Sequence, residues 1–168
     1  MIHVTPLSRL TDTLAASTAR RVISLQSLTA SFERPTGIAP GDYLQLAMHD
    51  IAEEREGYVA PSRDQVAAIL GFAEGVSIDN PLLIHCYAGI SRSTAAAYVI
   101  AAAIRPEMDE RALADELRRR SPSATPNPRI IAWADDLLGR KGRMVAAIRS
   151  IGRGAEAFEG TPFTLLEE

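Results

Sequence analysis

The feature that most constrains the fold is an apolar run that leads, through a short glycine-containing turn, into a second apolar segment rich in alanine. Residues 81–85 read Pro-Leu-Leu-Ile-His, a continuous run typical of a parallel strand buried on both faces. Residues 92–104 are predicted to form a buried helix. A buried strand followed directly by a helix is the repeating unit of proteins that pack helices against a parallel sheet.

Other segments alternate between the same two patterns. Strands are predicted at residues 2–5, 21–25 and 43–48. Helices are predicted at residues 7–18, 62–73, 109–120 and 128–139, with a continuation over residues 143–151. Residues 32–42 contain two prolines and two glycines and are predicted to be an exposed loop. We therefore expect an α/β fold in which a small central, mostly parallel sheet of four or five strands is flanked by helices.

The length of the chain fits a single domain. With 168 residues it can bury its own core, so residues 1–168 are expected to form one domain. Residues 154–168 are weakly patterned and are expected to form a loosely packed tail along the surface. The longest apolar stretch, residues 95–104, is much shorter than the roughly twenty residues of a membrane-spanning helix, so no membrane span is expected.

Charge and cysteine content narrow the function further. The formal net charge of −3 gives no overall attraction to nucleic acid, so no nucleic-acid partner is expected. The first residues lack the features of a signal peptide, and we expect a cytoplasmic protein. Cys86 is the only cysteine, which excludes an internal disulfide, a cysteine-rich metal site and a thiol relay within the chain. Such a cysteine is either a small core residue or a reactive group, and we expect neither a metal nor a cofactor.

The turn between the buried strand and the buried helix has the composition of an anion site. Unpaired N–H groups at a helix N-terminus bind anions, and Gly89 allows the turn to curl around one. Arg92 follows Cys86 by six residues, and its guanidinium can fold back to bind two phosphate oxygens. The predicted phosphate-binding residues are Tyr87, Ala88, Gly89, Ile90, Ser91 and Arg92. We call residues 87–91 the phosphate loop.

Cys86 is expected to lie at the floor of the phosphate loop. Hydrogen-bond donors that hold phosphate also stabilise a thiolate, the nucleophilic form of cysteine. We expect Cys86 to attack phosphorus and form a phosphocysteine, Ser93 to donate a hydrogen bond to the departing sulfur, and His85 to hold the cysteine backbone. The Cys-to-Arg spacing alone arises by chance about one time in ten, but its combination with His85, Gly89 and Ser93 makes coincidence rare.

These residues resemble the signature H-C-x-x-G-x-x-R-S/T of the protein tyrosine phosphatase superfamily, and in particular its compact dual-specificity type. His85, Cys86, Gly89, Arg92 and Ser93 match every defined position. The resemblance implies a cysteine-phosphatase fold and a two-step, metal-independent hydrolysis of phosphotyrosine, or of phosphoserine and phosphothreonine. The segment Pro-Asn-Pro at residues 126–128 also resembles the family, which implies that Asn127 helps to position the hydrolytic water.

The same resemblance implies a general acid, normally an aspartate on a mobile loop upstream of the cysteine. Asp50 stands 36 residues before Cys86 and follows the predicted strand at residues 43–48. It would protonate the leaving group and then activate water. Three nearby alternatives remain open, namely Glu53, Glu54 and Glu56. His49 is expected to support the loop rather than to take part in the chemistry.

Other classes of protein also use a cysteine in such a loop. A phosphatase of lipids or small phosphoesters stays an alternative, although the phosphate loop contains none of the lysines that would match extra phosphate charge. An arsenate reductase would need more cysteines, and the Gly89, Arg92 and Ser93 pattern suits a sulfur transferase less well. A non-catalytic phosphate-binding pseudophosphatase is the alternative outside the enzymes. Tyr87 and residues 51–61 are expected to form the rim of the site, and the oligomeric state stays open.

Overall fold

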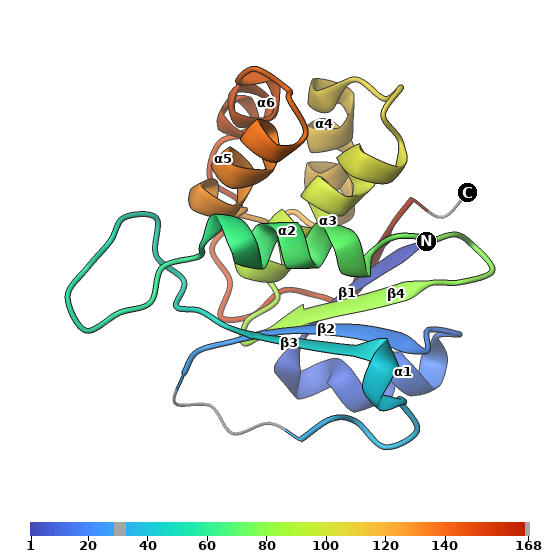
Figure 1. Cartoon of the computed structure of the whole chain (residues 1–168). Coiled ribbons are helices and arrows are strands. Elements are labelled where there is room, and N and C mark those ends of the chain that lie inside the picture. Colours follow the sequence, from blue (N-terminus) through green and yellow to red (C-terminus); the bar gives the residue numbers. More distant parts are fainter. Residues whose placement is uncertain (29–32, 167–168) are drawn as a thin grey trace.

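The computed structural model describes residues 1–28 and 33–166, and these form a five-stranded sheet covered on both faces by helices (Figure 1). The strand order is β3-β2-β4-β1-β5. The strands are β1 (Ile2–Pro6), β2 (Arg21–Gln26), β3 (Tyr43–Ala47), β4 (Leu82–Cys86) and β5 (Phe163–Leu165). The first four run parallel to one another, and β5 pairs with β1 in the antiparallel direction. The predicted α/β fold with a small, mostly parallel sheet is therefore confirmed.

The helices divide unequally between the two faces of the sheet. The short α1 (Leu10–Ala16) lies on one face, and the other helices lie on the opposite face (Figure 1). These are α2 (Arg63–Phe72), α3 (Arg92–Ile104), α4 (Glu110–Arg120), α5 (Pro128–Leu137) and α6 (Arg143–Ile151). A capping box begins α2, because Ser62 and Gln65 exchange side-chain and backbone hydrogen bonds.

The core is built around β4 and α3, the two elements that frame the predicted site. All five residues of β4 are buried, as expected for a parallel strand covered on both faces. Every residue of α3 from Arg92 to Ala102 is also buried. Its alanines let this helix approach the sheet closely on one side and α4 and α5 on the other. The end of β4 and the start of α3 are therefore held within the buried core.

Two predicted elements differ from the structure near the N-terminus. The helix predicted at residues 7–18 divides into a 3-10 turn, Leu7–Arg9, and the shorter α1. The predicted exposed loop begins at Phe32, which lies outside the described residues, and it ends in a 3-10 turn at Pro40–Asp42. Ile38 within this loop is buried with Val22 and Leu83, so the loop supplies part of the small core beneath the sheet.

The prediction of a loosely packed tail at residues 154–168 is wrong for residues 163–165, which are paired in the sheet. Residues 163–165 form β5, and its register places Phe163 opposite Val4 and Leu165 opposite Ile2. Leu165 is fully buried in the main core. The segment joins the sheet because an edge strand without a partner would leave the N–H and C=O groups of β1 unpaired.

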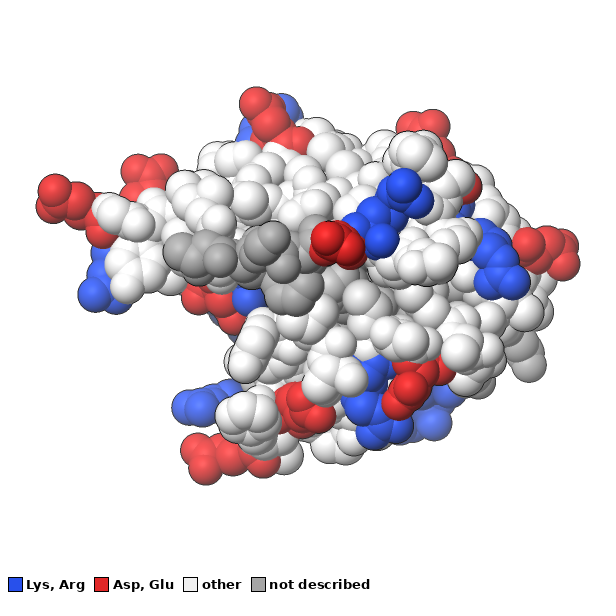
Figure 2. Space-filling model, turned by 90° about the horizontal axis from the view of Figure 1, so that it is seen from below, with Lys and Arg blue, Asp and Glu red and all other residues white. Residues whose placement is uncertain are grey.

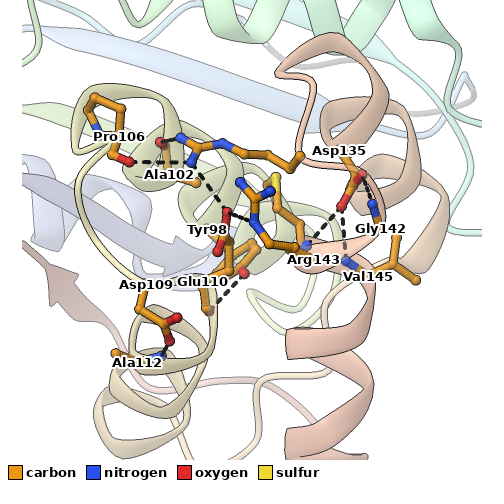
Figure 3. A network of polar contacts seen from close by, with 12 residues as sticks. Tyr98, Ala102, Pro106, Asp109, Glu110, Ala112, Asp135, Gly142, Arg143 and Val145 are labelled. Atoms are coloured by element: carbon orange, nitrogen blue, oxygen red, sulfur yellow. Dashed lines mark hydrogen bonds and ion pairs between the residues drawn. The ribbon is translucent and has the colours of Figure 1, made fainter.

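A polar network joins α4, α5 and α6, which lie on the same face of the sheet (Figure 3). The Glu110 carboxylate, at the start of α4, accepts hydrogen bonds from Arg140 and Arg143 at 3.2 and 3.0 Å. The Asp135 carboxylate of α5 accepts hydrogen bonds from the N–H groups of Gly142 and Met144 at 2.6 and 2.8 Å. Asp135 thereby binds the N-terminal end of α6, where unpaired N–H groups favour a negative charge.

The surface carries both kinds of charge. On the face beneath the sheet, acidic and basic side chains of the described residues are interspersed (Figure 2). Among the described residues, no helix is both long and apolar enough to cross a membrane.

Replacement of Leu165 by alanine tests the place of β5 in the core. We expect Leu165→Ala to lower the free energy of unfolding by about 2 to 4 kcal/mol, because it removes a fully buried side chain. Leu28→Ala is the matched control, since Leu28 is 54% exposed and its loss should change stability by less than about 0.5 kcal/mol. Equal effects of the two substitutions in urea unfolding would contradict the packing of β5.

A second prediction concerns His85, which is buried within β4 and lies 3.2 Å from the Gln26 amide of β2. Burial lowers the pKa of His85 from 6.5 to about 4. Between these two pH values the unfolded chain binds a proton that the folded protein does not, so stability falls as the pH falls. The loss should be on the order of 3 kcal/mol by pH 4.

The measurement is urea unfolding of the wild type and of His85→Asn across this pH range. Asparagine does not titrate, so the difference in stability between the two proteins should shrink as the pH falls. A difference that stays constant between pH 6.5 and 4 would show that His85 is not held neutral by the fold.

Candidate active site

The predicted catalytic residues meet at one edge of the sheet, where the parallel strands end. Cys86 is the last residue of β4, and Asp50 follows β3 by three residues. The carboxyl ends of parallel strands share an edge, which is where α/β proteins place their sites. Arg92 and Ser93 begin α3 at the same edge. The structure therefore brings together the four residues that were predicted to be catalytic.

The phosphate loop is held from outside through its carbonyl groups. The Tyr87 carbonyl accepts a hydrogen bond from the Leu7 N–H at 3.0 Å, and the Ala88 carbonyl accepts one from the Gly160 N–H at 2.8 Å. Further along, the Ile90 carbonyl accepts from the Thr125 N–H at 2.9 Å. Three segments far apart in the sequence therefore surround the loop and bind its outer side.

This outward direction of the carbonyls determines where the N–H groups point. In a planar trans peptide the N–H of one residue points opposite to the preceding carbonyl. The N–H groups of Ala88, Gly89 and Ser91 therefore face the inside of the loop. The Gly89 N–H reaches the Cys86 sulfur at 3.3 Å. The loop is thus a ring of inward donors, the arrangement that binds a phosphate dianion.

Gly89 is required at the tightest point of the loop. Its φ of +68° lies in the left-handed region, which side chains other than glycine rarely adopt. A Cβ atom at this position would also lie 2.7 Å from the backbone nitrogen of Pro6, at the end of β1. The glycine of the signature is therefore explained by both conformation and space.

The Cys86 sulfur lies at the floor of the loop and is almost fully buried, with 2% of the residue exposed. Besides the Gly89 N–H, the Ser93 hydroxyl lies 3.1 Å from the sulfur. Donors aimed at sulfur stabilise its anionic form. The predicted contact between Ser93 and Cys86 is present.

Arg92 is also buried, with 6% of the residue exposed. Its Nη1 donates to the Met48 carbonyl at 2.8 Å and lies 3.4 Å from the Ser27 hydroxyl. Its Nε is a buried donor without a hydrogen-bond partner among the described residues. A buried N–H without a partner is unfavourable unless a ligand satisfies it, and an oxyanion within the loop is the chemically suited acceptor.

Asp50 is connected to the phosphate loop by hydrogen bonds to a single carboxylate oxygen. The Ser91 hydroxyl donates to its Oδ1 at 2.7 Å, and the Asn127 amide donates to the same oxygen at 2.8 Å. Of the three alternative acids, Glu54 binds Arg129 at 3.0 Å and its side chain is 85% exposed, and Glu53 and Glu56 are exposed as well. Of these four carboxylates, Asp50 is the one for which the described residues show a hydrogen bond to the phosphate loop.

Asn127 contacts the predicted general acid directly. Its amide nitrogen donates to Asp50, and its part in positioning the hydrolytic water stays a prediction. Its side-chain oxygen accepts from the N–H groups of Arg129 and Ile130 and so caps α5. The Asn127 N–H also donates to the Ser91 carbonyl at 3.3 Å. One buried residue thus bonds to the start of α5, to the phosphate loop and to Asp50.

The segment that carries Asp50, residues 50–61, is anchored by residues that sequence reasoning missed. Arg129 donates to the Pro61 carbonyl at 2.8 Å, and the Trp133 indole N–H donates to the same carbonyl at 3.2 Å. His49 accepts a hydrogen bond from the Val59 N–H at 2.9 Å, which confirms its expected supporting role. Bonds to backbone carbonyls leave no pattern in the sequence, so only the structure reveals these anchors.

Metal ligands are not gathered in the part of the chain that the structure describes. Within residues 1–28 and 33–166, no group of three or more His, Cys, Asp and Glu side chains could hold a metal ion. The donors that face the site are N–H groups and a guanidinium, which suit an anion rather than a cation.

No protein-family model matches the sequence, and no curated protein matches it. Solved structures do match. DUSP15 superposes with a TM-score of 0.64 at 17% identity, over 89% of this chain and 90% of that chain.

Two further structures extend the comparison. The human tyrosine phosphatase-like serine/threonine/tyrosine-interacting protein has a TM-score of 0.64 at 19% identity, over 83% of this chain and 92% of its own. The active form of Tk-PTP has a TM-score of 0.54 at 19% identity, over 83% of this chain and 90% of its own. The chain therefore has the fold of compact tyrosine and dual-specificity phosphatases.

Proposed function

We propose that this protein is a cysteine-dependent phosphatase that hydrolyses phosphotyrosine through a phosphocysteine intermediate. One observation carries the proposal: the buried Cys86 sulfur lies inside a loop whose N–H groups point inward, beside a buried Arg92 Nε that has no partner among the described residues. The fold shared with tyrosine and dual-specificity phosphatases supports it.

The substrate phosphate binds to hydrogen-bond donors that the fold already holds in place. The inward N–H groups and the Arg92 guanidinium bind the non-bridging oxygens of the phosphate. Arg92 and Cys86 are buried, and donors in a buried site act more strongly than in solvent. The phosphorus is then in line with the Cys86 sulfur and the leaving oxygen. No metal ion or cofactor takes part in the proposed chemistry.

In the first step the Cys86 thiolate attacks phosphorus. An S–P bond forms, the bond from phosphorus to the tyrosine oxygen breaks, and a proton passes from Asp50 to that oxygen. The hydrogen bonds from Ser91 and Asn127 both end on Oδ1 of Asp50, so Oδ2 is the oxygen that would carry the proton. Ser91 and Asn127 therefore position the acid without occupying its reacting oxygen.

In the second step water attacks the phosphocysteine. Asp50, now a carboxylate, accepts a proton from the water, an O–P bond forms and the S–P bond breaks. The departing sulfur becomes a thiolate, which the Ser93 hydroxyl and the Gly89 N–H stabilise. Inorganic phosphate leaves and the starting state of the enzyme is restored.

The proposed preference for phosphotyrosine rests on the rim of the site. Tyr87, the first residue of the phosphate loop, is 61% exposed, and Tyr58 in the segment that carries Asp50 is 45% exposed. Aromatic rims favour an aromatic substrate group. The phosphate loop contains none of the lysines that a multiply phosphorylated lipid headgroup would favour.

Hydrolysis of an aryl phosphate, without added metal, tests the proposal across about pH 4.5 to 8. We expect turnover by the wild type, none by Cys86→Ser, and a loss of about a hundredfold or more in kcat for Asp50→Asn. Glu53→Gln is the matched control, because it removes an exposed acid of the same segment, and its activity should equal that of the wild type.

Two outcomes would contradict the proposal. Activity lost in Glu53→Gln but retained in Asp50→Asn would show that the general acid is wrongly assigned. A wild-type protein that binds vanadate but hydrolyses nothing would instead be a non-catalytic phosphate-binding module.

A further inference from the structure

A groove of about 280 Å³ lies directly beside the phosphate loop, on a surface that the proposed chemistry does not use. It is lined by Leu7, Ser8, Tyr87, Ala88, Phe158 and Glu159. Tyr87 and Ala88 belong to the phosphate loop itself, so the groove is continuous with the proposed phosphate site. Its volume suits one side chain of a substrate rather than a separate small molecule.

Three hydrogen bonds hold the walls of the groove together. The Leu7 N–H binds the Tyr87 carbonyl, and the Ser8 hydroxyl donates to the Glu159 carboxylate at 2.7 Å. The Gly160 N–H binds the Ala88 carbonyl. The groove is therefore already formed before a substrate binds, and its position relative to Cys86 is set by the same bonds that shape the phosphate loop.

Gly160 explains how the C-terminal segment comes so close to the phosphate loop. A Cβ atom at this position would lie 2.8 Å from the Gly89 carbonyl oxygen, so a side chain here would push the two segments apart. The close approach places the two preceding residues, Phe158 and Glu159, against the loop. Both lie in the part of the chain that was predicted to be a loose tail.

The chemistry of the groove combines exposed aromatic rings with a negative charge. Tyr87 and Phe158 line the same groove and are 61% and 87% exposed, so both rings are open to contact by a partner. The Glu159 carboxylate accepts a hydrogen bond from Ser8, and among the described residues no cation lies within ion-pair distance of it. An acidic side chain would be repelled here, and an apolar one would leave the carboxylate without a counter-charge.

We propose that this groove binds a basic side chain, above all arginine, that flanks the phosphorylated residue of a protein substrate. The stem of arginine packs along apolar surface, its planar guanidinium stacks on aromatic rings, and its charge pairs with Glu159. The preferred substrates then carry a phosphate dianion and a neighbouring cation, which match the phosphate loop and the groove respectively. This inference rests on the proposed phosphatase function.

The test uses pairs of phosphotyrosine peptides that differ in one residue, arginine or glutamine, placed just before the phosphotyrosine in one pair and just after it in the other. For at least one pair we expect the wild-type kcat/KM to favour arginine by about fivefold. In Glu159→Gln this ratio should fall toward about twofold, since glutamine can still accept the Ser8 hydrogen bond but carries no charge. Phe158→Ala should lower the ratio similarly.

Two further variants sharpen the result. Glu156→Gln is the matched control, because Glu156 is an exposed acid of the same segment outside the groove, and it should leave the ratio unchanged. Glu159→Lys should reverse the preference, so that a peptide with glutamate at the flanking position is hydrolysed faster than its arginine counterpart.

Failure of this inference can be distinguished from failure of the proposed function. If an aryl phosphate is hydrolysed but neither peptide pair shows a preference for arginine, the groove proposal is overturned and the phosphatase stands. The same holds if the preference survives unchanged in both Glu159→Gln and Phe158→Ala. If neither aryl phosphate nor peptide is hydrolysed, both proposals fall.

Discussion

The hydrogen bonds to the outer carbonyls of the phosphate loop are the constraint on which the rest of the site depends. Donors from Leu7, Thr125 and Gly160 hold these carbonyls outward, and the loop N–H groups therefore face inward. Without them the loop could turn its carbonyls toward the sulfur, where they would repel both a thiolate and a phosphate. Backbone hydrogen bonds alone therefore connect the proposed chemistry to the end of β1, the segment before α5 and the C-terminal segment.

The proposed general acid, Asp50, follows β3 and the proposed nucleophile, Cys86, ends β4, and Asn127 bonds to the segments that carry both. Its side chain caps α5 and binds Asp50, while its N–H binds the Ser91 carbonyl. Arg129 and Trp133, two and six residues after Asn127, bind the Pro61 carbonyl and so secure the far end of residues 50–61, the segment that carries Asp50. The polar contacts of Glu110 and Asp135 in turn link α5 and α6 to the rest of the helical layer. The placement of Asp50 relative to Cys86 therefore depends on helix packing as well as on the phosphate loop.

The sequence predicts the parts of this arrangement that leave a local pattern. The strand at residues 82–86, the helix at residues 92–104 and the motif between them were all predictable, because burial and the chemistry of an anion site restrict residue types at each position. Asp50 was predictable from its place after a strand and from the resemblance. The contact between Asp50 and Asn127 spans 77 residues and depends on packing that no local pattern encodes. The strand β5 is three residues long, and only its pairing with β1 defines it, so the groove that Phe158 and Glu159 line could not be foreseen.

The central claim is that Cys86 carries the phosphoryl group between two steps, and trapping that intermediate tests it most directly. An aryl phosphate with a good leaving group needs little help from a general acid, so Asp50→Asn should form the phosphocysteine and then hydrolyse it slowly. We expect peptide mass spectrometry of the stopped reaction to find one added phosphoryl group on Cys86, and none in the double variant that also carries Cys86→Ser. Release of the aryl product with no phosphoryl group on Cys86 at any time would contradict the account.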